Sequence, residues 1–295
     1  MKHSSKKLIL KIFLYIILPI FVFWIIFPFV WVVMSSFMNI KELGAVPPNW
    51  IPKEPTLKNY RSVLLGKFSS GAHETGHQIG TYESSRPVLP AMGNSFYISF
   101  IVALYNTIVG GLAAYSMSRF RTKFNRSLYL TFLGSRVLPP MAMVIPFFIL
   151  FRMLKLINTP WVLILSYNLF ILPLSIWLLK VYFDKVPADL EEMGMIDGLG
   201  RFGTLFRIVI PIAIPGFVAV FIMSMLEGWS EFFYALILTD QLTMPPVLIG
   251  FRQIEQILWN QMAAAAVLTV LPPVVLVLVL QKYIVSGLTA GAVKG

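Results

Sequence analysis

The sequence predicts an all-α integral membrane protein with six transmembrane helices. Of its 295 residues, 57% are hydrophobic and only 13% are charged, whereas soluble domains carry about 25% charged residues. Such a chain has too few charges to cover the surface of a soluble fold. Its net charge of +11 could indicate a nucleic-acid partner, but no basic stretch is interleaved with aromatic residues as on a nucleic-acid-binding surface. We therefore expect membrane lipid around the chain and no nucleic acid.

Six stretches are long and apolar enough to span a bilayer. A spanning helix needs about 20 predominantly apolar residues, because the hydrocarbon core is about 30 Å thick. The stretches are residues 8–37, 94–117, 128–151, 160–181, 208–238 and 262–280. The first is too long for a signal peptide and is predicted to be a membrane anchor. Prolines inside the third and fifth are compatible with broken helices.

These spans organise the chain as a single transmembrane domain over residues 1–295. An extracytoplasmic segment is expected at 38–93 and a cytoplasmic loop at 182–207. With the N-terminus in the cytoplasm, 14 Lys and Arg residues would lie in cytoplasmic segments and nine outside. Basic residues favour the cytoplasmic side. We therefore expect a multi-pass protein of a bacterial or archaeal plasma (inner) membrane, with both termini cytoplasmic.

The extracytoplasmic segment contains a match to a zinc-protease motif. His73-Glu74-Thr75-Gly76-His77 has the spacing in which two histidines bind zinc and the glutamate activates water. That chemistry requires a helix, but the surrounding glycines and the lack of apolar periodicity predict a loop. A membrane-anchored zinc metalloprotease is therefore the weaker alternative, and we expect no catalytic residue and no metal site. No phosphate loop for ATP is present in the sequence either.

The cytoplasmic loop predicts a short helix outside the membrane. Pro187 suits the first turn, and acidic residues follow where the helix dipole favours negative charge. Gly198 and Gly200 would end the helix in a left-handed turn. The acidic residues are Asp189, Glu191 and Glu192, and the apolar edge is Leu190, Met193 and Ile196. Because anionic lipid attracts basic residues instead, we expect this helix to bind a protein partner.

The same loop resembles the EAA loop of binding-protein-dependent ABC importer permeases. That pattern is E-A-A, three residues, G, nine residues and I-x-L-P, and it is matched by Glu192, Gly198, Ile208 and Pro211. Met193 and Gly194 replace the two alanines. Glycine at 194 should loosen the helix by up to about 1 kcal/mol relative to alanine.

Further segments are similar to the carbohydrate importers of the maltose type. They are residues 94–95, 113–120, 229–236 and, most specifically, the tail 287–295. The similarity covers nearly the whole chain. Residues 66–90 have no counterpart in it, so we interpret them as an insertion of this protein.

The resemblance implies the ABC type I importer permease fold with a cytoplasmic coupling helix. Two permease subunits, expected to form a heterodimer, would make the pathway, and two ATPase subunits that bind ATP and Mg would drive alternating access. This chain would hold no cofactor and would not be an enzyme. The residues implied to couple to the ATPases are Glu191, Glu192, Met193, Gly194, Asp197, Gly198, Ala290, Val293 and Lys294. An extracytoplasmic sugar-binding protein would dock near Met244, Pro245, Pro246 and Val247.

Charged and aromatic residues in the fifth span are candidates for the translocation pathway. They are Glu227, Trp229, Glu231, Phe232 and Tyr234. The two glutamates are four residues apart and so share a helix face, and charges at that depth usually face an interior or a cavity. Alternatively, the glutamates form a structural pair with Arg136 of the third span and the aromatic residues only pack. The sequence leaves both interpretations open.

Together these features predict the permease subunit of an ATP-driven importer of a mono- or oligosaccharide. A permease for glycerol phosphate or another polyol is the nearest alternative. A standalone channel or secondary transporter is a third, and it would be active without an ATPase partner. The sugar itself is not identified, because in this family specificity lies largely in the binding protein and the other permease subunit.

Overall fold

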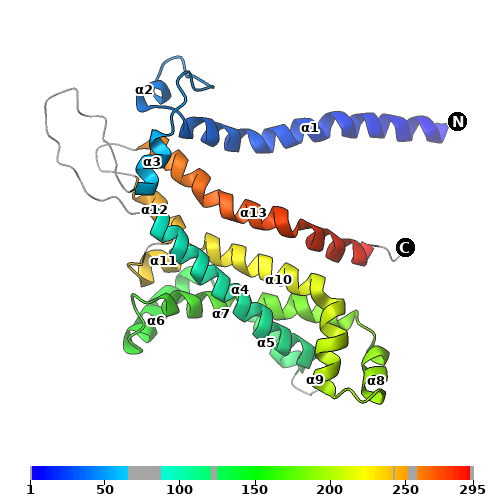
Figure 1. Ribbon diagram of the computed structural model, residues 1–295. Helices are drawn as coiled ribbons and strands as arrows, with labels where there is room; N and C mark the ends of the chain where they lie inside the picture. Colours follow the sequence, from blue (N-terminus) through cyan, green and yellow to red (C-terminus); the bar gives the residue numbers. More distant parts are fainter. Residues whose placement is uncertain (1, 66–87, 121–124, 242, 252–257, 293–295) are drawn as a thin grey trace. The chain divides into compact units, whose positions relative to one another are not determined.

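The computed structural model describes residues 2–65, 88–120, 125–241, 243–251 and 258–292. Regular structure in these ranges is helical throughout (Figure 1), which confirms the all-α class. The chain divides into two compact units. The first comprises Met1–Val88 and Leu248–Val270, and the second comprises Leu89–Val247 and Leu271–Gly295. The last helix therefore contributes residues to both units.

Five helices within the described residues are long and apolar enough to cross a membrane. They are α1 (Lys2–Ser36), α4 (Val88–Arg119), α7 (Pro160–Asp184), the helical run Arg201–Ser230 that ends in α10 (Ile210–Ser230), and α13 (Trp259–Ala292). Each contains a stretch of high mean hydropathy. They correspond to five of the six predicted spans.

The third predicted span, 128–151, is interrupted. The structure has α5 (Asn125–Ser135) and α6 (Pro140–Met153) there, with residues 136–139 outside any helix. Pro139 and Pro140 explain the interruption, because proline cannot donate a backbone hydrogen bond and disfavours helical geometry in the residue before it. Neither helix alone has the length of the other spans, so a sixth span made of both stays a prediction.

The fifth predicted span, 208–238, differs from the structure at both ends. The helical run begins earlier, with α9 (Arg201–Thr204) and a π-helical turn at Leu205–Val209, and continues into α10. It also ends earlier, at Ser230, and is followed by the separate short helix α11 (Phe233–Leu238). Part of the predicted cytoplasmic loop is therefore a helical extension of the span.

A buried asparagine of α3 links the helices of the first unit. It contains α1, α2 (Ile40–Leu43), α3 (Lys58–Leu65) and the first part of α13. Asn59 Nδ2 donates hydrogen bonds to the carbonyl oxygens of Ser36 and Met38, both at 2.8 Å. Asn260 Nδ2 donates to Asn59 Oδ1 at 2.9 Å. One side chain of α3 thus binds the end of α1 and the start of α13.

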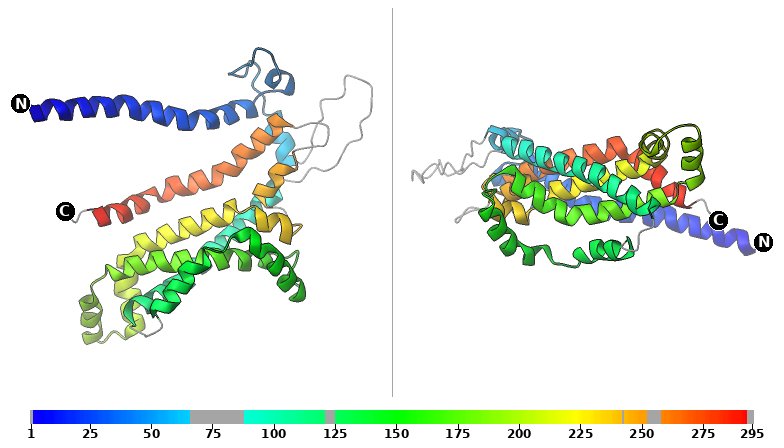
Figure 2. Two further views of the ribbon diagram at one scale, coloured as in Figure 1. Left: turned by 180° about the vertical axis from the view of Figure 1, so that it is seen from behind. Right: turned by 90° about the horizontal axis from the view of Figure 1, so that it is seen from below.

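The second unit is built around α4, α7 and α10, which pack closely (Figure 2). Asn106 of α4 donates to Asn168 Oδ1 of α7 at 2.6 Å, and both residues are buried. On α10, a Cβ atom built at Gly228 would lie 3.3 Å from Ser99 Cα of α4. Glycine at this position therefore allows the two helix backbones to approach, as small residues do between membrane helices.

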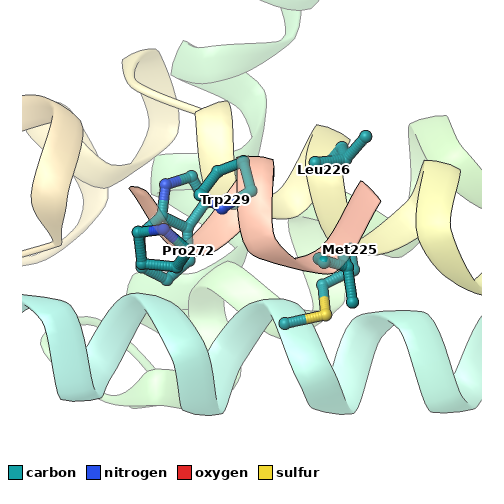
Figure 3. Close-up of a pocket in the computed structure, with 6 residues that line it drawn as sticks. Met225, Leu226, Trp229 and Pro272 are labelled. Carbon is teal, nitrogen blue, oxygen red and sulfur yellow. The ribbon is translucent and has the colours of Figure 1, made fainter. Parts of the chain in front are cut away.

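The later part of α13 belongs to this unit and lies next to α10. Met225, Leu226 and Trp229 of α10 line a small recess together with Pro272, Pro273 and Leu276 of α13 (Figure 3). The recess is lined by apolar side chain types, and Trp229 is 4% exposed. It therefore suits apolar packing better than the binding of a hydroxylated ligand.

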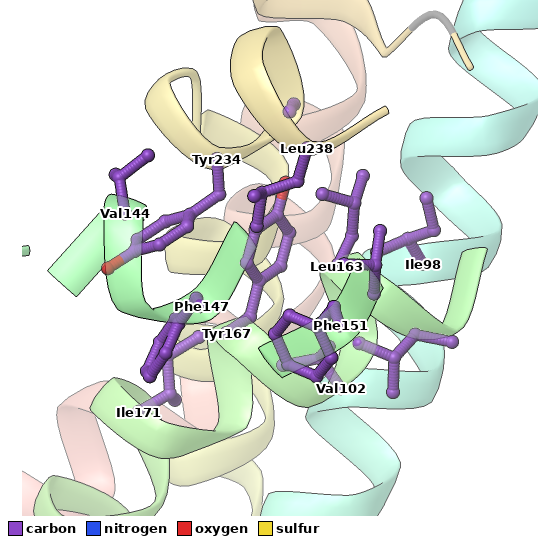
Figure 4. Packing of buried hydrophobic residues seen from close by; sticks show 13 residues of the cluster. Ile98, Val102, Val144, Phe147, Phe151, Leu163, Tyr167, Ile171, Tyr234 and Leu238 are labelled. Carbon is purple, nitrogen blue, oxygen red and sulfur yellow. The ribbon is translucent and has the colours of Figure 1, made fainter. Parts of the chain in front are cut away.

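Two apolar clusters hold the second unit together. One lies where α4, α6, α7 and α11 meet and includes Ile98, Phe147, Phe151, Tyr167 and Tyr234 (Figure 4). The other joins the later part of α4 and α7 to the π-helical turn and α10. Its members include Ala114, Leu179, Phe183, Leu205 and Val209. This second cluster supports the helices that carry the candidate functional site.

Candidate functional site

The predicted short helix of the cytoplasmic loop is present as α8 (Ala188–Ile196), preceded by Pro187. Its end agrees with the role expected of Gly198, which has a φ of +85°, a left-handed conformation that favours glycine. The amide of Leu199 donates to the carbonyl of Gly194 at 3.0 Å and closes the turn. Gly200 differs from its prediction: its φ is −66°, and it caps the start of α9.

One face of α8 is exposed and combines charge with apolar surface. Glu192 and Asp197 are exposed, as are Met193 and Ile196 of the predicted apolar edge, with Ile196 84% exposed. Leu190, the third member of that edge, is half-buried. Exposed side chains of this mixture, outside the apolar spans, are suited to binding another protein.

Two further aromatic residues near α8 are exposed and were not predicted from the sequence. Phe202 of α9 is 75% exposed and Phe206 of the π-helical turn is 60% exposed. Both follow α8 in the chain and belong to the segment interpreted as a loop. Their signal in the sequence was an unexplained pair of phenylalanines between Arg201 and Arg207.

Glu191 occupies a different environment from its neighbour Glu192. It is 7% exposed, and its carboxylate accepts hydrogen bonds from two side chains of α4. Arg119 Nε bonds Oε1 at 2.5 Å, and Tyr115 Oη bonds Oε2 at 2.8 Å. This carboxylate is thus bonded within the chain, whereas the resemblance to the EAA loop predicted it on the surface that meets the ATPases.

Gly194 lies where α8 packs against the helical run into α10. A Cβ atom built there would lie 2.5 Å from Ile208 Cδ1 and 3.4 Å from Thr204 Oγ1. Thr204 is 1% exposed. The close approach gives a packing reason for glycine at this position, where the EAA pattern has alanine.

Glu227 of α10 faces Arg136, which lies between α5 and α6. Arg136 Nη2 is 3.4 Å from Glu227 Oε1 and 3.5 Å from Oε2. Both side chains are about one-third exposed. The ion pair that was weighed against a pathway role is therefore present for Glu227, and the partial exposure of Glu227 leaves room for a further contact.

Glu231 does not pair with Arg136 but caps α11. Its Oε1 accepts the amides of Phe233 at 2.9 Å and Tyr234 at 3.0 Å, and its Oε2 accepts the amide of Ala235 at 3.3 Å. An acidic side chain that binds the free amides of a first turn stabilises the start of a helix. Glu231 thus stabilises the first turn of the helix that follows α10.

The aromatic candidates differ in exposure. Trp229 and Tyr234 are 4% and 2% exposed, and Tyr234 Oη donates to the carbonyl of Pro140 at 2.7 Å. Phe232, in the break between α10 and α11, is half-buried. In this conformation Trp229 and Tyr234 are packing residues, and only Phe232 presents part of its ring.

The residues predicted to dock a binding protein are mostly internal. They lie at the start of α12 (Met244–Ile249). Met244 and Val247 are fully buried, Pro246 is buried and Pro245 is half-buried. The Met244 amide donates to Ser95 Oγ at 2.8 Å. Only Pro245 is partly available to a partner.

Several residues with a predicted role lie outside the part of the chain that the structure describes. The zinc-like motif with His73, Glu74 and His77 lies outside the described residues, as do Val293 and Lys294. Ala290 lies within α13. Among the residues that the structure does describe, no group of three His, Cys, Asp or Glu side chains could hold a metal ion.

Comparison with known proteins identifies the class. The family described as "Binding-protein-dependent transport system inner membrane component" matches residues 106–290. The chain belongs to this family. It is a multi-pass inner membrane permease subunit of an ABC transporter and is not an enzyme.

Individual relatives match nearly the full length. The chain is 30% identical to the inner membrane ABC transporter permease protein YcjP of Escherichia coli (strain K12), over 99% of both chains. It is 33% identical to the trehalose/maltose transport system permease protein MalG of Thermococcus litoralis, over 92% of both chains. Its fold is similar to a chain of a bacterial ABC transporter involved in the import of alginate. That match has a TM-score of 0.74 and 19% sequence identity, and it covers 95% of this chain and 98% of that one.

Proposed function

We propose that this chain is one of two permease subunits of a carbohydrate importer and that α8 is its coupling helix. Two ATPase subunits, which bind ATP and Mg, drive the transporter, and an extracytoplasmic sugar-binding protein delivers the cargo. The supporting observation is the exposed face of α8, where Glu192, Met193 and Ile196 stand outside the apolar spans. Phe202 and Phe206 extend the apolar part of this surface.

The proposed topology has six spans and cytoplasmic termini. Helices α5 and α6 contain 11 and 14 residues. At about 1.5 Å per residue they are together long enough to cross a hydrocarbon core of about 30 Å. The excess of basic residues in the segments that would then be cytoplasmic supports this orientation.

The proposed cargo is a mono- or oligosaccharide. Full-length similarity to a trehalose/maltose permease supports a carbohydrate, and glycerol phosphate or another polyol is the alternative. Of the predicted pathway residues, Glu227 and Phe232 are partly exposed, and we place them ahead of Trp229 and Tyr234 as lining residues. Pro245 is the corresponding candidate for contact with the binding protein.

Substitution of Glu192 tests the coupling surface. The transporter is purified through a tag on this chain, with its ATPase subunits co-expressed, and the amount of co-purified ATPase is measured. Glu192→Lys should lower that amount several-fold, because it reverses a charge on the docking face. The matched control is Glu54→Lys, an identical charge change at an exposed residue of the extracytoplasmic segment, which should leave it unchanged. Equal ATPase recovery with Glu192→Lys and with the parent chain would refute the coupling role.

Uptake into proteoliposomes tests the cargo. The assembled transporter is supplied with the binding protein and with radiolabelled trehalose, maltose, longer glucose oligomers or glycerol phosphate. ATP-dependent uptake of a sugar is the expected result. Uptake of glycerol phosphate alone would favour the polyol alternative, and uptake that persists without ATPase subunits would favour a secondary transporter.

A further inference from the structure

Buried carboxylates are uncommon unless they are paired, and α8 contains one that the proposed docking surface leaves unexplained. Glu191 turns away from the exposed face, and both of its oxygens bind side chains in the last turns of α4, those of Arg119 and Tyr115. The Arg119 side chain is only 16% exposed. An ion pair shielded in this way is weakened little by salt, in contrast to a surface pair.

The same arginine also binds the connection between α7 and α8. Arg119 Nη2 donates to the carbonyl of Val186 at 2.9 Å, and Val186 is 4% exposed. Beside it, Ser118 Oγ donates to Asp184 Oδ1, at the end of α7, at 2.6 Å. The end of α4 is therefore bonded to the end of α7, to the connecting segment and to α8.

The other side of α8 is also held tightly. At Gly194 the helix approaches Ile208 so closely that no Cβ atom fits without a shift of that side chain. Helix α8 thus contacts the end of α4 on one side and packs against the helical run that leads into α10 on the other. Its polar attachment is on the α4 side and its apolar attachment is on the α10 side.

We propose that Glu191 is a positioning residue and that the Glu191–Arg119 pair is a tether that makes α8 and α4 move as one body. The inference rests on the proposed function, because it takes α8 to be the helix that the ATPases displace. Motion of α8 then reaches α4 through the ion pair. It reaches α7 and α10 through the backbone that connects them to α8. Glu192 contacts the ATPase, whereas Glu191 transmits the displacement inward.

A distance measurement between α4 and α8 tests the tether. The chain contains no cysteine, so Leu112→Cys on α4 and Met195→Cys on α8 provide two unique sites for spin labels, both at exposed side chains. The distance is measured by double electron–electron resonance in the complex with cysteine-free partner subunits, without nucleotide and after trapping with ADP and vanadate. We expect one narrow distance that is the same in both states.

Variants of the pair and of the adjacent carboxylate should behave differently. Glu191→Gln should broaden the distance distribution and make it depend on the nucleotide state. Exchange of the two charges, Glu191→Arg with Arg119→Glu, should narrow it again. The matched control Glu192→Gln should keep the narrow distance while less ATPase co-purifies.

A narrow, unchanged distance in Glu191→Gln would overturn the proposal, as would a parent distance that changes on trapping. If Glu191→Gln fails to accumulate in the membrane, Arg119→Lys provides the same measurement, because lysine keeps the charge but lacks the guanidinium fork that binds two acceptors. Failure of the proposed function has a different signature. In that case no ATPase co-purifies with the parent chain, and the distance in the permease alone still reports whether the pair holds α8 to α4.

Discussion

Substitution of Glu231 distinguishes a helix cap from a pathway residue. Its carboxylate accepts the amides of Phe233, Tyr234 and Ala235, the first three residues of α11. That helix has six residues, and a helix this short is not stable by itself. We therefore expect Glu231→Ala to release α11 from its position, whereas Glu231→Gln retains most of the cap.

The geometry sets the size of the effect. Loss of an N-cap side chain costs about 0.5–2 kcal/mol, and the charge on this acceptor places Glu231→Ala near the upper end, at about 2 kcal/mol. Glutamine keeps the Oε1 acceptor, which receives the two shorter hydrogen bonds at 2.9 and 3.0 Å. Only the 3.3 Å bond to Ala235 is lost, so Glu231→Gln should cost about 0.5–1 kcal/mol.

Two measurements on each variant separate the interpretations. One is the midpoint of SDS-induced unfolding in mixed micelles, and the other is ATP-dependent uptake by the assembled transporter. If Glu231 is a helix cap, Glu231→Gln should unfold close to the parent midpoint and should still transport. Glu231→Ala should unfold at a lower SDS concentration and should lose uptake. If Glu231→Gln unfolds like the parent but no longer transports, the charge itself is needed and Glu231 belongs to the pathway.

Three further predictions concern the packing of the second unit. Asn168→Leu should lower the free energy of unfolding by about 1–2 kcal/mol. Asn106→Leu should lower it by less, because it also removes the Asn106 Oδ1 atom, which has no hydrogen-bond partner among the described residues. A double-mutant cycle of the two should give a coupling of about 0.6–1.7 kcal/mol. Gly228→Val should lower the SDS unfolding midpoint more than any of these, because its Cβ would lie 3.3 Å from Ser99 Cα, and an unchanged midpoint would contradict the close packing. Tyr234→Phe removes one hydrogen bond of 2.7 Å and should cost about 1 kcal/mol in the same assay, with little change in uptake because the ring stays buried.

The apolar spans were predictable because each is a local property of the sequence. A run of about 20 apolar residues is sufficient to indicate a membrane helix. The prolines of the third span were compatible with the break at residues 136–139, but they did not predict it, because the similar pair Pro272-Pro273 lies inside the continuous helix α13. The break after α10 was harder to predict. Residues 208–238 form one apolar run, and the new helix depends on how the Glu231 side chain folds back onto the amides of α11.

The distinction between functional and structural residues was less predictable, because it depends on contacts between distant segments. Arg119 and Glu191 are 72 residues apart in the sequence, and Arg136 and Glu227 are 91 residues apart. Local pattern identifies the charged residues but not their partners. The burial of Met244 has the same cause, since its environment includes Ser95 of another helix.

The two adjacent glutamates of α8 show why a cluster of acidic residues need not form one surface. Successive side chains on an α-helix are separated by about 100° around its axis, since each turn has 3.6 residues. A helix that packs on one side therefore places Glu191 inward when Glu192 points outward. The inward glutamate faces Arg119, and glycine at 194, on the buried side, admits Ile208. Only the outward glutamate remains available to a partner, so an equal effect of the two substitutions on ATPase binding would contradict this division of roles.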